Sequence, residues 1–177
     1  MSKLRTAIAP MAIDASGSAY SLVLGSAEID AHQFERLVTT GREAAAAGRH
    51  DQAAQQLATA LAQWRDRPFE DIADVKIGQA PAARLASMRE GAITTRLECL
   101  ISVGQIDLAA QELESLVVLK PLVERWWALL MVTLYRQDRQ ADALRVFQQA
   151  RTVLAEELGL EPGPELRDLE AKILTVR

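Results

Sequence analysis

Few side chains in this 177-residue sequence could carry catalysis or bind a metal, and they are scattered. His32 and His50 lie near the starts of expected helices, and neither has a second metal ligand three or four residues away. The one cysteine, Cys99, falls in an apolar helical stripe, which favours a buried and inert thiol. Glu156 and Glu157 come just before a glycine and suggest a solvated helix end. We therefore predict a chain that is not an enzyme, with no metal site and no cofactor.

Composition limits the remaining classes of protein. Hydrophobic residues make up 49% of the chain, enough for a folded core, and the formal charge of −4 disfavours a protein that coats nucleic acid. A single cysteine excludes an intrachain disulfide. No apolar run reaches the roughly 20 residues needed to span a bilayer, and Pro10 and Asp14 interrupt the only candidate for a signal-peptide core. We expect a cytoplasmic protein that does not associate with membranes.

The elements that would position any site are almost all helical. Alternation around a turn-forming cluster predicts one short N-terminal β-hairpin, with residues 10–14 paired to 19–24. Helical periodicity then predicts about seven helices, with a loop over 66–79 and with Pro81 and Pro121 as helix-opening residues. The expected helices are 30–47, one from 51 to about 64, 81–104, 106–119, one from 121, 140–158 and 164–175. The fold class is all-α, a stack of helical hairpins.

Three segments share one spacing of small and large apolar residues. Each has a turn residue, a small alanine five positions later and a larger apolar residue four positions beyond that. The last two segments are 34 residues apart, and the first two are separated by 34 plus a 22-residue insertion. This period resembles the tetratricopeptide repeat, in which the small residue lets two helices approach and the larger one fills the gap to the next pair. The triplets are Gly48, Ala53 and Leu57; Gly104, Ala109 and Leu113; and Asp138, Ala143 and Phe147.

Longer stretches resemble one family. Residues 20–22, 29–34, 44–48, 60–65, 127–131, 135–136 and 141–144, and above all the segment from Leu154 to Arg167, are similar to the bacterial transcriptional activator domain. This domain is the regulatory part of the actinobacterial antibiotic regulatory proteins, and the resemblance covers about residues 20–176. It implies a regulatory protein-interaction and dimerisation domain over 25–177.

The resemblance also implies a DNA-binding neighbour. In the family an OmpR-like winged helix precedes the domain, and residues 1–24 resemble its tail, namely the end of the recognition helix and the wing hairpin. Lys3 and Arg5 would be DNA contacts left in this remnant. The rest of the winged helix has no counterpart here, so direct DNA binding by this chain is disfavoured. Expected partners are proteins such as RNA polymerase or another regulator subunit, with a homodimer as a further possibility.

In tetratricopeptide domains the first helix of each pair lines a concave groove, and the resemblance implies the residues that would face it here. A solvated face is the alternative interpretation of the same positions. For Trp64, Trp126, Trp127 and Tyr135, core packing competes with a binding role. A second hypothesis for the whole chain is a stand-alone helical scaffold, or the sensor module of a signalling ATPase or cyclase. The expected groove residues are Glu35, Val38, Arg42, Thr94, Glu98, Arg125, Val132, Tyr135 and Arg136.

Overall fold

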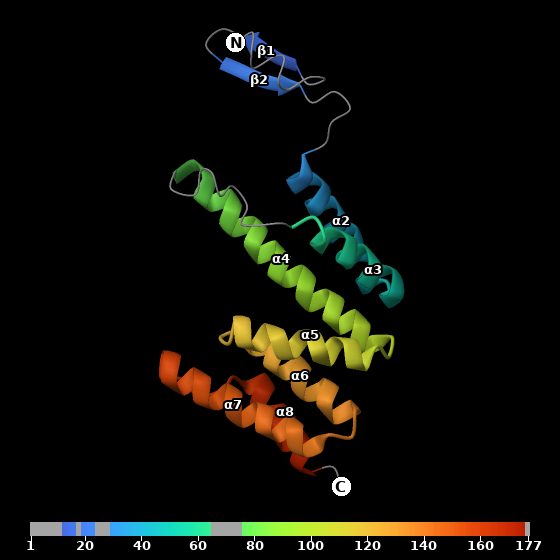
Figure 1. Cartoon of the computed structure of the whole chain (residues 1–177), viewed down its shortest axis with the longest axis vertical. Helices are drawn as coiled ribbons and strands as arrows, with labels where there is room; N and C mark the ends of the chain where they lie inside the picture. Colours follow the sequence, from blue (N-terminus) through green and yellow to red (C-terminus); the bar gives the residue numbers. More distant parts are fainter. Residues whose placement is uncertain (1–11, 17–18, 24–28, 65–75, 176–177) are drawn as a thin grey trace.

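A computed structural model describes residues 12–16, 19–23, 29–64 and 76–175. A β-hairpin and seven helices make up this part of the chain, and Figure 1 shows the helices stacked along one axis with the hairpin apart from them. The strands are β1 (Ala12–Ser16) and β2 (Ala19–Val23). The helices are α2 (Asp30–Ala46), α3 (His50–Leu61), α4 (Lys76–Ser102), α5 (Ile106–Leu119), α6 (Glu124–Arg136), α7 (Gln140–Leu158) and α8 (Pro164–Thr175). The predicted all-helical stack is confirmed.

The two strands pair antiparallel, with Ala12 opposite Val23 and Ser16 opposite Ala19. The first strand was predicted over 10–14, and it lies two residues further along the chain because the pairing of Ser16 with Ala19 sets the register. The DNA contacts expected at Lys3 and Arg5 lie outside the described residues.

Both helix starts predicted at prolines are wrong. Helix α4 begins at Lys76, so Pro81 lies inside it, in the second turn. Proline at that position removes one backbone hydrogen bond, and packing of the long helix on its neighbours compensates for this loss. Helix propensity alone disfavours proline inside a helix, so the sequence predicted a helix start there. Pro121 lies in the turn before α6, where the carbonyl of Pro121 accepts a hydrogen bond from Nε1 of Trp127 at 2.7 Å.

The turn residues of the three repeats adopt one conformation. Gly48, Gly104 and Asp138 all have positive φ, at 75°, 81° and 59°. After each turn a backbone N–H donates to a carbonyl five residues earlier, at 2.9 Å from Arg49 to Ala44, at 2.9 Å from Gln105 to Leu100 and at 3.0 Å from Arg139 to Leu134. Glycine adopts this left-handed backbone without a steric cost, and aspartate is among the few other residues that tolerate it.

The repeat alignment is also confirmed by burial. The three alanines predicted at the helix crossings, Ala53, Ala109 and Ala143, are fully buried. The larger residues four positions later, Leu57, Leu113 and Phe147, are buried as well. The helical hairpin formed by α2 and α3 is packed especially closely. A Cβ atom added at Gly41 of α2 would lie only 2.7 Å from Cγ of Leu57 in α3.

The core consists of two clusters, and helices α2, α3 and α4 contribute to both of them. The smaller cluster joins α2, α3 and the first half of α4 through Phe34, Val38, Leu57 and Leu85. The larger one continues through α5, α6, α7 and α8 and is centred on the buried face of α6. The first repeat is therefore connected to the others through α4 and through Ala44, Ala53 and Ala54 of α2 and α3. No helix in the described part of the chain is both long and apolar enough to cross a membrane.

Candidate protein-interaction surface

The first helices of successive repeats pack beside one another, α2 against α4, α4 against α6, and α6 against α8. All nine groove positions expected from the repeat lie on α2, α4 or α6. The structure brings several of them together through charged side chains that cross from one helix to the next. We call this set of side chains on α2, α4 and α6 the first-helix surface.

On α2 the first-helix surface carries Glu35 and Arg42. Glu35 forms an ion pair with Arg84 of α4. The guanidinium group of Arg42 lies against Gly91 of α4, so closely that a Cβ atom added to this glycine would clash with Nη2. Gly91 therefore makes room for the exposed guanidinium group of Arg42 beside α4.

Arg125, near the start of α6, joins three helices. It donates to Glu98 of α4, with Nε 3.1 Å from Oε1, and forms a second ion pair with Glu165 of α8. Burial acts to lower the pKa of the Arg125 guanidinium, but its hydrogen bonds and the charges of Glu98 and Glu165 outweigh burial and raise the pKa. Arg125 thus stays charged between two carboxylates. Glu98 and Arg125, which were predicted as separate groove positions, belong to one charged cluster with Glu165.

The tryptophan side chains belong mainly to the core. Trp126 and Trp127 are buried, and Nε1 of Trp126 donates to Oγ1 of Thr94 at 2.9 Å. Thr94, expected to face a partner, therefore serves as a hydrogen-bond acceptor for a core side chain. Trp64 is half-buried, with its ring edge-on to Phe34 at 5.3 Å and the guanidinium of Arg89 4.7 Å from its centroid.

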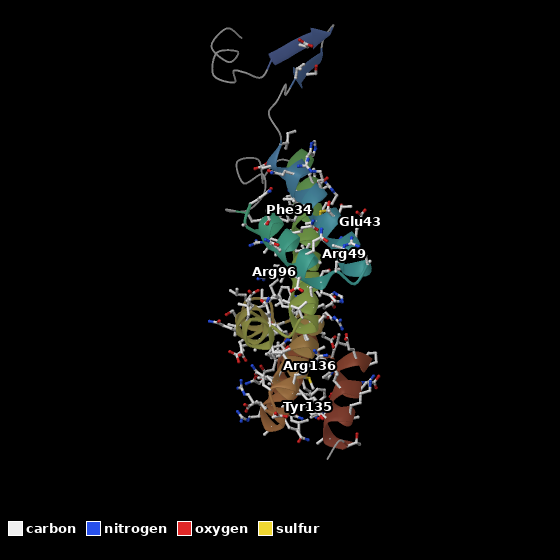
Figure 2. The ribbon with its side chains drawn as sticks, turned by 90° about the vertical axis from the view of Figure 1, so that its right-hand side faces the viewer. Phe34, Glu43, Arg49, Arg96, Tyr135 and Arg136 are labelled. Carbon is white, nitrogen blue, oxygen red and sulfur yellow. The ribbon has the colours of Figure 1, made fainter. Side chains whose placement is uncertain are left out.

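Val38 does not lie on the first-helix surface. It is only 1% exposed and packs in the smaller core cluster, because a face of α2 also has to cover α3 and helical spacing alone does not separate the two directions. Val132 and Tyr135 on α6 are half-buried. Arg136, next to Tyr135 in Figure 2, is exposed, yet its Nη1 donates to the carbonyl oxygen of Ile101 at 2.9 Å and so satisfies an acceptor at the end of α4.

Sequence reasoning missed two contacts around α6. Lys120, the residue that follows α5, pairs with Glu90 of α4 at 2.6 Å. The carboxylate of Glu124 accepts a hydrogen bond from the backbone N–H of Gly163 at 2.6 Å, and a Cβ atom at Gly163 would lie 2.9 Å from Oε2 of Glu124. A glycine between two prolines was the sequence signal, but its partner lies 39 residues away and only the fold reveals it.

The side chains that could have carried chemistry are placed in structural roles. Cys99 is buried as predicted, with Sγ 3.7 Å from Nδ1 of His50. Burial, and to a lesser degree the charge of Glu98, raises the pKa of the Cys99 thiol, so the thiol is protonated and unreactive at neutral pH. In the described part of the chain no three histidine, cysteine, aspartate or glutamate side chains gather as a metal site would require.

A stack of helical hairpins with a charged surface along its first helices defines a helical-repeat domain. The chain belongs to the family of the bacterial transcriptional activator domain, whose model matches residues 29–174. The resemblance to the bacterial transcriptional activator domain that the sequence predicted is therefore confirmed.

Similar proteins with known names are transcriptional regulators. The chain is 36% identical to the transcriptional regulatory protein EmbR of Mycobacterium tuberculosis over 155 residues, which cover 88% of this chain and 40% of EmbR. It is 34% identical to the regulatory protein DnrI of Streptomyces peucetius, over 88% of this chain and 57% of DnrI. The chain thus spans about half the length, or less, of these relatives. Because the matched family is one of regulators, the prediction that the chain is not an enzyme agrees with it.

A solved structure supports the fold. The chain superposes on M. tuberculosis EmbR, a structure described as a complex with a low-affinity phosphopeptide, with a TM-score of 0.84 and 35% sequence identity. The match covers 92% of this chain and 43% of the EmbR chain.

Proposed function

We propose that this chain is the regulatory, protein-binding and dimerisation domain of a transcriptional regulator, and that it contacts its protein partner through the first-helix surface. The observation that carries the proposal is the cluster of Glu98, Arg125 and Glu165, which joins α4, α6 and α8 in one charged surface. A partner that competes for Arg125 would change how three helices are held together. Binding would in this way be coupled to the arrangement of the repeats.

Residues 1–24 are proposed to be the tail of a winged helix and 25–177 the regulatory domain. The support is the family match over 29–174 and the similarity to named transcriptional regulators. DNA contact would then be made by a winged helix, and the present domain would recruit RNA polymerase or another regulator subunit to the promoter.

Arg42 is the residue with which to test the first-helix surface. It is exposed and makes no ion pair with any described residue, so its loss removes little from the fold. We expect Arg42→Glu to weaken binding to RNA polymerase purified from an actinobacterium by about tenfold, a change of about 1.4 kcal/mol. Arg49→Glu, at an exposed residue in the turn between α2 and α3 and therefore outside the first-helix surface, is the matched control and should bind as the unmodified chain does.

Binding can be measured by biolayer interferometry on the immobilised chain, with circular dichroism to verify that both variants fold. Equal binding by the two variants would show that the first-helix surface is not the contact. If neither RNA polymerase nor any regulator subunit binds the unmodified chain, the proposal of a protein-binding role is wrong.

A further inference from the structure

Helix α4 meets side chains of the neighbouring first helices at three positions that are seven residues apart. Seven residues are close to two helical turns, so the three positions form one stripe along α4. We call them the three crossings of α4. The side chains that meet there are Arg84 with Glu35 of α2, Gly91 with Arg42 of α2, and Glu98 with Arg125 of α6.

The middle crossing lacks the acidic partner that the outer two have. Helices α2 and α4 keep the same offset of 49 residues at both of their crossings, from Glu35 to Arg84 and from Arg42 to Gly91. At the first of these, opposite charges pair. At the second, Arg42 is exposed, makes no ion pair with any described residue and meets a glycine, which has no side chain. The middle of the stripe therefore carries a positive charge without a counter-charge.

We propose that a partner protein supplies this counter-charge, as an aspartate or glutamate side chain that pairs with Arg42 at the middle crossing. The proposal rests on the proposed protein-binding function and names the chemistry that the first-helix surface recognises. A guanidinium group presents its N–H donors in one plane and can pair with a carboxylate through two of them. Because the guanidinium group of Arg42 already lies against α4 at Gly91, less of its freedom is lost when the carboxylate binds.

A second polar group lies beside the middle crossing. Ser87 is exposed one helical turn before Gly91, and its hydroxyl makes no hydrogen bond to a described residue. Residues four apart are neighbours on a helix surface, so this hydroxyl is available to a segment bound at Arg42. Seven residues of α4 rise by about 10 Å, which three residues of an extended peptide also span. The acidic residue would therefore lie about three residues from the parts of the segment that pass the outer crossings.

The charges along the stripe favour a carboxylate over a phosphate group as the occupant. The outer crossings contain at least as many carboxylates as arginines, because Arg125 pairs with both Glu98 and Glu165. A phosphate group on a side chain carries close to two negative charges at neutral pH, about one more than Arg42 can balance. The excess charge would be repelled by Glu35 and Glu98 on either side. A single carboxylate matches Arg42, so the expected partner presents an acidic and unphosphorylated segment.

Selection from a library of random nine-residue peptides tests the proposal on the whole chain. Peptides displayed on phage are selected on the immobilised chain, and those that also bind Arg42→Gln are removed. The remaining peptides should share one position occupied by aspartate or glutamate. In the tightest of them, replacing this residue by its amide should weaken binding to the unmodified chain by at least about tenfold and should make no further difference with Arg42→Gln.

Affinities can be measured by fluorescence anisotropy of the labelled peptide, with circular dichroism to verify that each variant folds. Arg49→Gln, at an exposed arginine outside the first-helix surface, is the matched control and should bind the peptide as the unmodified chain does. Gly91→Glu supplies a carboxylate at the middle crossing from within the chain. This variant should therefore lose peptide binding, and glutamate is a better helix former than glycine.

Three results would overturn the proposal: a selection that yields no shared acidic position, equal peptide binding by Arg42→Gln and Arg49→Gln, or tighter binding when phosphoserine replaces the acidic residue. The last result would assign the middle crossing to a phosphorylated partner. The proposed function is judged separately. If selected peptides bind through Arg42 but neither RNA polymerase nor a regulator subunit binds the chain, the chemistry of the middle crossing stands and the proposed partners are wrong.

Discussion

Truncation of Phe147 tests the repeat architecture most directly. Phe147 is the large residue of the third repeat, in α7, and is 4% exposed within the larger core cluster. Phe147→Ala removes the aromatic ring from a site that neighbouring helices fill on all sides. Such a change costs about 3–5 kcal/mol, made up of lost burial and the cavity left behind. For a chain of this size, that loss lowers the melting temperature by roughly 6–20 °C.

The measurement is guanidinium unfolding followed by helical circular dichroism and by tryptophan fluorescence, which reports on the buried Trp126 and Trp127. The same truncation at the equivalent position of the second repeat, Leu113→Ala, should cost about 2–5 kcal/mol. Leu174→Ala, at an exposed position, is the control and should change the unfolding free energy by less than about 0.5 kcal/mol. If Phe147→Ala loses no more stability than this control, the repeat alignment and the packing argument built on it are both wrong.

Three further predictions follow from contacts in the fold. Ala143→Trp should destabilise the chain by about 1–3 kcal/mol or more in chemical unfolding, because the fully buried alanine leaves no space between its helices. Gly163→Ala should lower the melting temperature, since its new methyl group displaces the carboxylate of Glu124 from the Gly163 N–H, whereas Leu174→Ala, at an exposed position of α8, keeps that contact. Hydrogen bonding by Arg139, together with the nearby arginine charges, lowers the pKa of Asp142 in the folded chain. The ionised carboxylate therefore stabilises the fold at pH values above the ordinary aspartate pKa of about 3.9, and this contribution is lost as pH falls through the lower pKa of the folded state. Asp142→Asn should show a smaller loss of stability on acidification in pH-dependent unfolding curves.

The sequence predicted those features that depend on local backbone geometry and on a repeated spacing. Gly48 and Gly104 were recognisable as turn residues, and alignment extended the same role to Asp138, which proved to share their left-handed backbone. The start of α4 could not be found in this way. Propensity treats Pro81 as a boundary, whereas the packing of a long helix against α2 and α3 carries the helix back to Lys76.

The candidate surface was predicted less completely, for a related reason. The register of a helix indicates which residues share a face, but a first helix in a stack faces its own hairpin partner, the neighbouring first helix and solvent. Val38 faces the hairpin partner of its helix. Thr94 and Arg136 contact the neighbouring first helix, and Arg42 is exposed to solvent. Which direction each side chain takes depends on residues distant in sequence, so no local pattern could have decided it.

The same distribution of contacts indicates which interactions a binding partner could replace without unfolding the stack. Helices α2, α3 and α4 contribute to both core clusters, and the ion pairs of Glu35 and Arg125 attach α2 and α6 to opposite parts of α4. Exposed ion pairs contribute little to stability, about 0–1 kcal/mol each, and a partner can replace them at small cost. The apolar clusters, by contrast, resist rearrangement because their packing is dense. A ligand that exchanges the Arg125 pairs for its own would therefore leave each repeat folded and would change only how α4, α6 and α8 are joined at the surface.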